Sequence, residues 1–142
     1  MAKYHNVLNN IKKVEVIESR YLNDITVIHG IGVMLNYWRN FNEITLSDLA
    51  EVEINGIIEN KYRLYSIKLS FHTPKSFDAG MRDLCYRVTT VNGSQFLIGT
   101  SRHPYPVTST TELFPSDVTA KSGTSVEVTY KNSHGMLSIL DK

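Results

Sequence analysis

The sequence is poor in the features that define several protein classes. It contains one cysteine, Cys85, so no disulfide can form within a single chain, and we expect a reduced thiol. No apolar run approaches the roughly 20 residues that a membrane-spanning helix needs. Basic and acidic side chains number 15 and 14, and no basic run is longer than Lys12-Lys13. Nucleic-acid binding without sequence preference needs an excess of basic residues. The sequence therefore gives no strong nucleic-acid signal, although balanced totals can still hide a local basic patch, and we expect no membrane span.

The totals predict one ordinary globular domain that is rich in β-structure. A chain of 142 residues suits a single domain, here taken as residues 1–142. Its apolar fraction of 42% and charged fraction of 20% are typical of folded proteins. The chain has 8 Tyr and 5 Phe together with many Val, Ile and Thr residues, which favour strands. The first thirteen residues are mostly polar and contain no continuous apolar stretch, so we expect no secretory signal.

Alternating apolar and polar residues predict strands along most of the chain. Turn signals recur between them, and little helix is indicated. Roughly seven to nine short strands at this spacing favour an all-β, mainly antiparallel fold, either a β-sandwich or a small barrel. The predicted strands are Lys12–Glu18, Ile25–Trp38, Ala50–Ile54, Tyr62–Phe71, the two arms of a hairpin over Cys85–Thr100, Ser125–Tyr130 and Met136–Leu140.

Two Asn-Gly pairs predict tight hairpin turns. Asn55-Gly56 and Asn92-Gly93 are the pairs that most readily supply the two positive φ angles of a type I′ turn. A two-residue turn at Asn92-Gly93 would place Val91 opposite Ser94, Val88 opposite Leu97 and Tyr86 opposite Gly99. Both faces of this hairpin would then carry apolar residues, so we expect it to be covered on both sides.

Two segments have a second interpretation. In Ile25–Trp38, a long strand with a bend or bulge at Gly30 and Gly32 competes with a helix over Val33–Phe41. Leu46–Leu49 fits either a short helical turn or a bend.

A proline-containing segment at about residues 101–118, within "SRHPYPVTSTTELFPSD", follows the hairpin. Proline fixes φ and removes a backbone donor, so we expect an extended segment suited to a sheet edge. It is either a surface that docks on a neighbouring protein or a plain connection between sheets. The loop His72–Asp83 is also long enough to suggest a role. The predicted interface residues are Phe77, Phe96, Ile98, His103, Pro104, Tyr105, Pro106 and Phe114.

No pattern of reactive side chains indicates an enzyme, a metal or a cofactor. The five histidines, His5, His29, His72, His103 and His134, lack the short spacings of ligand clusters. Cys85 and His103 can be paired as nucleophile and base, but a buried structural thiol is the favoured interpretation. The glycines of "HGIGV" lack the third glycine and the helix of a phosphate-binding loop.

The stretch from Lys68 to Val107, with the hairpin "YRVTTVNGSQFLIGT" and the following "PYPV", resembles small β-rich proteins of tailed bacteriophages and prophages. Those proteins are built into virions near the head–tail connection or in the tail. The resemblance covers about a third of the chain and includes no catalytic signature. It implies a non-enzymatic subunit that binds copies of itself and other virion proteins. It also implies synthesis in the cytoplasm of a bacterial host and a final location in the virion.

The leading functional hypothesis is therefore a structural subunit of a larger assembly, a virion component of the head–tail connector or tail. A carbohydrate- or ligand-binding β-sandwich module is the alternative, because such modules bind sugars on exposed aromatic rings. The aromatic candidates for that role are Tyr37, Trp38, Tyr62, Tyr65 and Tyr105.

Overall fold

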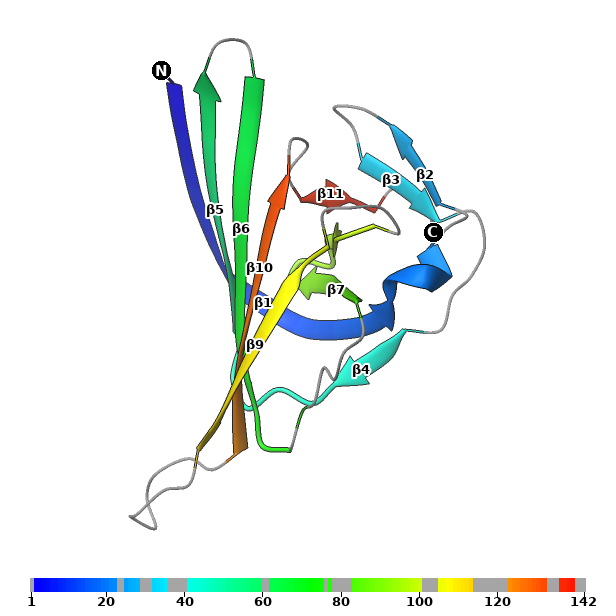
Figure 1. Ribbon diagram of the computed structural model, residues 1–142. Helices are drawn as coiled ribbons and strands as arrows, with labels where there is room; N and C mark the ends of the chain where they lie inside the picture. The colour runs from blue at the N-terminus through cyan, green and yellow to red at the C-terminus, as the bar shows by residue number, and fades with distance from the viewer. Residues whose placement is uncertain are drawn as a thin grey trace.

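The computed structural model is built almost entirely of antiparallel strands (Figure 1). It describes residues 2–22, 25–28, 32–35, 41–59, 62–75, 77, 83–100, 105–113, 123–132 and 136–139. Within these residues the single helical element is a short 3₁₀ helix, η1 (Ser19–Leu22), and no helix is long and apolar enough to cross a membrane. The predicted all-β, mainly antiparallel class is confirmed, and the main sheet is curled like half of a barrel.

The described residues contain eleven strands, more than the sequence predicts. Residues 42–44 and 107–113 lack the alternating pattern, and the one strand expected over residues 25–38 forms two. The strands are β1 (Ala2–Glu18), β2 (Ile25–Ile28), β3 (Gly32–Leu35), β4 (Asn42–Ile44), β5 (Ala50–Glu59), β6 (Tyr62–Thr73), β7 (Leu84–Thr90), β8 (Gln95–Ile98), β9 (Val107–Leu113), β10 (Gly123–Asn132) and β11 (Leu137–Ser138).

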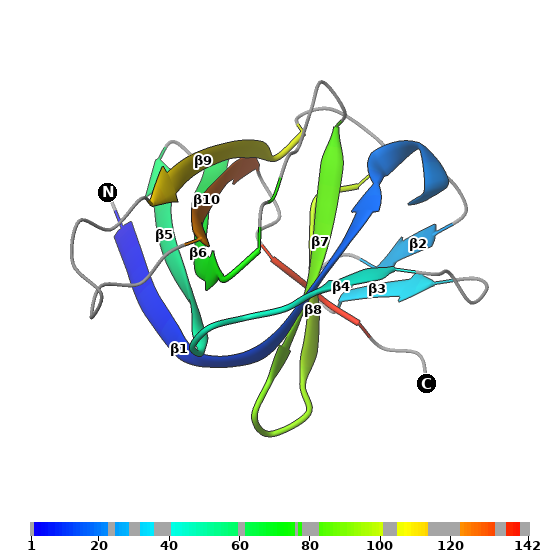
Figure 2. The same cartoon turned by 90° about the horizontal axis from the view of Figure 1, so that it is seen from below.

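Nine strands form one sheet in the order β11-β8-β7-β1-β5-β6-β10-β9, with β4 paired to β1. Strand β1 joins the two halves of this sheet. Its first half, Ala2–Leu8, pairs with β5, while its second half pairs with β7 on one side and β4 on the other. Register shifts occur between Leu8 and Ile11 and between Ile11 and Lys13, where the strand changes partners. Bulges bend strands, and Figure 2 shows the resulting curl.

The curl encloses the larger of two hydrophobic clusters. Alternate residues of β6 and β10 contribute to it, as the predicted apolar faces of these strands require, and Tyr86 and Val88 of β7 are completely buried there. A smaller cluster forms around Ile17, Cys85 and Leu97. Every residue of β7 is buried, which confirms that the β7–β8 hairpin is covered on both sides.

The register of the β7–β8 hairpin differs from the prediction by one residue. Tyr86 pairs with Ile98, and Val88 pairs with Phe96. The Thr90 amide donates to the Ser94 carbonyl and the Gly93 amide donates to the Thr90 carbonyl, at 2.9 and 3.0 Å. Gly93 has a φ of 92°. This is a three-residue loop with a left-handed glycine rather than a two-residue type I′ turn.

The predicted turn at Asn55-Gly56 is wrong. Both residues lie inside β5, where Asn55 pairs with His5 and Ser66, and Gly56 pairs with Tyr4 and Tyr65. The β5–β6 ladder continues to Glu59 opposite Tyr62, so Asn55 and Gly56 do not form the turn between these two strands. The local turn preference of Asn-Gly is overridden by pairing with a strand on each side.

The long strand expected over residues 25–38 is also wrong. Ile25–Ile28 and Gly32–Leu35 form an antiparallel pair of their own, β2–β3. Residues 29–31, which include Gly30, lie outside the described residues. The competing helix fails over residues 33–35, which belong to β3, and residues 36–40 are outside the described part. Around Leu46–Leu49, the chain bends without forming a helix.

Candidate interaction surface

Strand β9 forms one edge of the curled sheet. It pairs with β10 along its whole length, from Val107 opposite Thr129 to Leu113 opposite Gly123. No described strand pairs with its other side. Pro106, which is buried, comes immediately before it. Because proline cannot donate to a ladder, it fixes where this edge begins. The prediction that the segment after the hairpin suits a sheet edge is confirmed for Val107–Leu113.

Contacts across the curl hold the start of β9 in place. The hydroxyls of Tyr86 and Thr108 share a hydrogen bond of 2.7 Å. Gly99 has a φ of 100°, and a Cβ atom there would lie 2.7 Å from Pro106 Cγ and 2.8 Å from Cys85 Sγ. The end of β8 and the start of β9 thus approach each other so closely that only glycine fits. These contacts fix the position of the first residues of β9 relative to β7 and β8.

Four side chains of β9 are exposed and uncharged. The side chain of Val107 is 67% exposed, and Ser109, Thr110 and Thr111 are exposed as well. Val107 stands at the end of a row that runs across the sheet through Thr129, Lys68 and Glu53 to Val7. Val7 is 40% exposed, so both ends of this row present a valine to solvent.

The first half of β1 is a second open edge, because β5 is its one described partner along Ala2–Leu8. Figure 1 shows this part of β1, with β5 and β6, extending beyond the rest of the sheet. The β1 edge carries Lys3 and ends at the register shift after Leu8. Lysines and bulges are features that hinder edge-to-edge pairing. Strand β9 has neither: its ladder is continuous and Glu112 is its one charged residue.

The structure separates the interface residues predicted from the sequence. Phe96 and Tyr105 are half-buried, and Phe96 packs against the larger cluster. Ile98 is completely buried in that cluster, and Pro106 is buried too. Their assignment to a surface is therefore corrected, since neither side chain is available to a partner. His103, Pro104 and Phe114 lie outside the described residues.

The structure also changes the interpretation of Phe77, which is predicted to lie at an interface, and of Val107, which is not. Phe77 packs edge-on against Phe71, with ring centroids 6.1 Å apart, so it supports the core from the His72–Asp83 loop. The exposed Val107 is not predicted, because a single valine between a proline and a run of Thr and Ser gives no periodic signal. Other large exposed apolar side chains are Val7, Tyr21, Leu49, Leu64 and Val91.

A buried ion pair stabilises the junction between β1 and β7. Arg87 donates from Nε and Nη2 to the two carboxylate oxygens of its cross-strand partner Glu15, at 2.9 and 2.8 Å. Both residues are buried, and the guanidinium lies 4.1 Å from the ring centre of Phe41. Lys13 Nζ approaches Glu15 at 3.9 Å from the partly exposed side. Bidentate geometry of this kind fixes the relative position of two strands.

Cys85 is a buried thiol and not an exposed nucleophile. Its side chain is completely inaccessible, and Sγ donates to the Thr100 carbonyl at 3.5 Å. Burial, with a smaller effect from Asp83, raises the pKa of Cys85 to about 12. The thiolate that nucleophilic chemistry needs is therefore suppressed at neutral pH. Among the described residues, no group of three or more His, Cys, Asp and Glu side chains is arranged to hold a metal ion.

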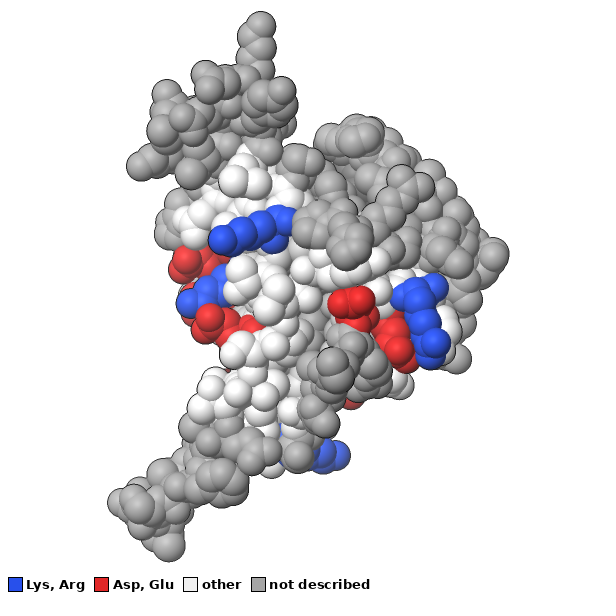
Figure 3. Space-filling model, in the orientation of Figure 1, with Lys and Arg blue, Asp and Glu red and all other residues white. Residues whose placement is uncertain are grey.

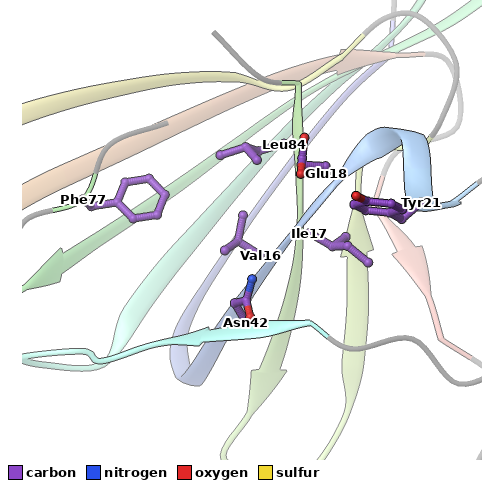
Figure 4. Close-up of a pocket in the computed structure, with 7 residues that line it drawn as sticks. All are labelled: Val16, Ile17, Glu18, Tyr21, Asn42, Phe77 and Leu84. Atoms are coloured by element: carbon purple, nitrogen blue, oxygen red, sulfur yellow. The ribbon is translucent and has the colours of Figure 1, made fainter. Parts of the chain in front are cut away.

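A small pocket lies beside the end of β1 (Figure 4). Its volume is about 150 Å³, below the roughly 300 Å³ at which pockets for drug-sized ligands begin. Glu18, Tyr21 and Asn42 give it a polar side, and Tyr21 is 45% exposed. The remaining lining is apolar and consists of Val16, Ile17, Phe77 and Leu84.

Charges of both signs are interspersed over the face of the molecule in Figure 3. Lys68 pairs with Glu127 at 3.5 Å, and Arg20 pairs with Glu18 at the same distance. The described surface along β9 is mostly uncharged in this view. On this face the described residues therefore do not form an extended basic area of the kind that binds a phosphate backbone.

Comparison of the chain with protein-family models, curated proteins and solved structures finds no match. The resemblance to phage and prophage structural proteins consequently stays a prediction from the sequence.

Proposed function

We propose that this protein is a structural subunit that works by associating with copies of itself and with neighbouring proteins of a larger assembly. The observation that carries the proposal is the outer edge of β9, with which no described strand pairs. The strand is seven residues long, its ladder with β10 has no bulge, and Val107, Ser109, Thr110 and Thr111 are exposed. An unprotected edge offers a row of backbone donors and acceptors to another strand, and proteins that stay monomeric usually block such edges. A sheet edge of this kind supports association through strand addition.

The finer proposal is a virion component of a tailed bacteriophage or prophage, located at the head–tail connector or in the tail. It is supported by the resemblance of residues 68–107 to small β-rich proteins of those particles. The β7–β8 hairpin and the residues up to Val107 carry this resemblance, and Val107 is also the first residue of the edge strand β9.

The direct test is the mass of the purified protein across a concentration series, measured by light scattering behind a sizing column. A discrete oligomer that grows in population with concentration is the expected result. A protein that stays monomeric at every concentration would contradict self-association.

For the finer proposal, antibody labelling of induced prophage particles in electron micrographs should place the protein on the virion, and its absence from the particles would reject that location.

A ligand-binding module is the second candidate, and the pocket beside β1 is the feature that favours it. An exposed tyrosine ring, a carboxylate and an amide are groups that bind sugars. Of the aromatic residues expected to form a sugar platform, Tyr65 instead packs against the core, and Trp38 lies outside the described residues. A glycan screen should give saturable binding that Tyr21→Ala and Glu18→Gln abolish. Binding that survives both substitutions would remove the pocket from consideration.

A further inference from the structure

We propose that β9 pairs with β9 of a second copy of this chain, antiparallel, about a two-fold axis at Thr110. This inference rests on the proposed function and specifies its partner and its register. The pairing would match Ser109 with Thr111, Thr108 with Glu112 and Val107 with Leu113, in each direction. The two curled sheets would join into one continuous sheet.

The composition of β9 favours pairing with itself. A symmetric antiparallel register uses all seven residues of the strand, from Val107 to Leu113. The one charged residue, Glu112, then lies opposite Thr108 and no like charge, and the apolar residues at the two ends lie opposite each other. Threonine and valine pairs across strands stabilise such ladders. About six to eight backbone hydrogen bonds would form, which is comparable to the number in a typical protein interface.

The topology favours β9 over β1 as the partner strand. Strands β1 and β9 are separated by four antiparallel pairings, β1–β5, β5–β6, β6–β10 and β10–β9, so they run in the same direction. An antiparallel contact between β9 of one copy and β1 of the next would turn the concave faces of successive copies to opposite sides. A two-fold axis perpendicular to the sheet keeps both concave faces on the same side and closes the assembly as a dimer.

The position of Pro106 agrees with this register. Pro106 ends the edge on one side of Val107, and the β9–β10 ladder ends at Leu113 opposite Gly123. The symmetric pairing involves only the residues from Val107 to Leu113. Because Thr108 is already tied to Tyr86 inside the curl, the strand is held in place before the second copy binds.

Cysteine cross-linking tests the register. The variant Thr110→Cys places two thiols opposite each other at the axis, where paired Cα atoms lie about 4.5 to 5.5 Å apart, within the range of a disulfide. Oxidation should convert it to a covalent dimer that reductant reverses. The matched control is Val107→Cys, whose thiol would lie opposite Leu113 of the second copy and should not cross-link. Cys85 is buried and does not interfere. Equal cross-linking of the two variants, or none at Thr110→Cys, would overturn the register.

A charge exchange tests the pairing by an independent route. Ser109→Lys with Thr111→Lys places lysines opposite each other on the exposed outer face, so the dimer should dissociate to monomer. Ser109→Lys with Thr111→Glu places opposite charges there and should restore the dimer. Within one chain, Ser109 lies opposite Glu127, so a lysine at this position lies opposite a negative charge on the neighbouring strand. Ser125→Lys, on the interior strand β10, is the matched control and should leave the mass unchanged.

The outcomes separate this inference from the proposed function. A discrete oligomer that persists in the double-lysine variant, or a charge exchange that fails to restore it, would overturn pairing through β9 and leave the structural-subunit proposal standing. A native chain that is monomeric at every concentration would contradict both. Circular dichroism of each variant verifies that the β-structure is retained, and the restored dimer of the charge-exchange variant verifies that lysine at position 109 permits folding.

Discussion

At the scale of single residues, a buried ion pair and a buried thiol influence the stability of the junction between β1 and β7. Arg87 and Glu15 are cross-strand partners with bidentate hydrogen bonds. Cys85 lies two residues before Arg87 and is completely buried. A buried charge without its partner is costly, and a buried thiol resists ionisation. The ion pair therefore makes stability sensitive to loss of one partner, and the thiol makes it sensitive to alkaline pH.

Removing either member of the ion pair should destabilise the fold strongly. We expect Arg87→Ala or Glu15→Ala to lower the free energy of unfolding by about 3 to 5 kcal/mol, because the remaining charge stays buried without its bidentate partner. Replacing both, as Arg87→Met with Glu15→Leu, should cost far less. Urea unfolding measures these differences. The control is Lys68→Ala, which breaks an exposed pair with Glu127 and should cost about 1 kcal/mol or less. A small effect of both single substitutions would contradict the prediction.

The buried thiol should make stability fall at alkaline pH. The pKa of Cys85 is raised from 9.0 to about 12 in the folded state, so above pH 9 the unfolded chain loses a proton that the folded chain keeps. Stability contributed by the neutral thiol is full below pH 9 and falls by up to about 1.4 kcal/mol per pH unit between pH 9 and 12. Tyr130, whose pKa burial also raises to about 12, adds to the slope above pH 10.

Unfolding of the native chain and of Cys85→Ala, measured from pH 7 to pH 11, isolates the contribution of the thiol. The native chain should lose stability more steeply than the variant above pH 9. The same thiol should stay unreactive toward a disulfide reagent at pH 8 until denaturant is added. Parallel pH profiles for the two proteins, or rapid labelling of the folded protein, would show that Cys85 is not shielded.

At the scale of elements, two glycines with similar backbone angles have different surroundings. Gly93 in the β7–β8 loop has a φ of 92°, and no atom lies within 4 Å of the position that a Cβ would take there. Gly99 has a φ of 100° and close contacts with Pro106 and Cys85. A left-handed conformation costs an alanine about 1 to 2 kcal/mol at either site. The contact at Gly99 adds to this cost.

We therefore expect Gly99→Ala to destabilise the protein more than Gly93→Ala does. Gly93→Ala should cost about 1 kcal/mol, and Gly99→Ala clearly more, because the β8 end and the β9 start must separate to admit a methyl group. Thermal unfolding compares the two variants directly. Equal losses would mean that the approach of β8 to β9 is not tight.

The same elements show what the sequence predicts well and where local patterns fail. Strands β6 and β10 are strongly alternating and are found where expected. The loop at Asn92-Gly93 is found too, but its register depends on hydrogen bonds between Thr90 and Ser94 that a residue pair alone does not specify. At Asn55-Gly56, pairing with β1 and β6 overrides the local turn signal.

At the scale of the whole molecule, position in the sheet determines which residues are available to a partner. Ile98 lies just before the proline-containing segment and Val107 lies within it. Both are apolar, yet Ile98 is completely buried and Val107 is 67% exposed. Edge and interior strands differ through neighbours that are distant in sequence, so alternation cannot distinguish them. The sequence thus predicts the region of the candidate surface but not its residues.

The mass of the native chain and of the Ser109→Lys, Thr111→Lys variant, compared at the same concentrations by light scattering, tests the central claim most directly. Association through the open edge of β9 predicts a discrete oligomer for the native chain and a monomer for the variant, both with intact β-type circular dichroism. Identical masses for the two proteins would contradict association through this edge.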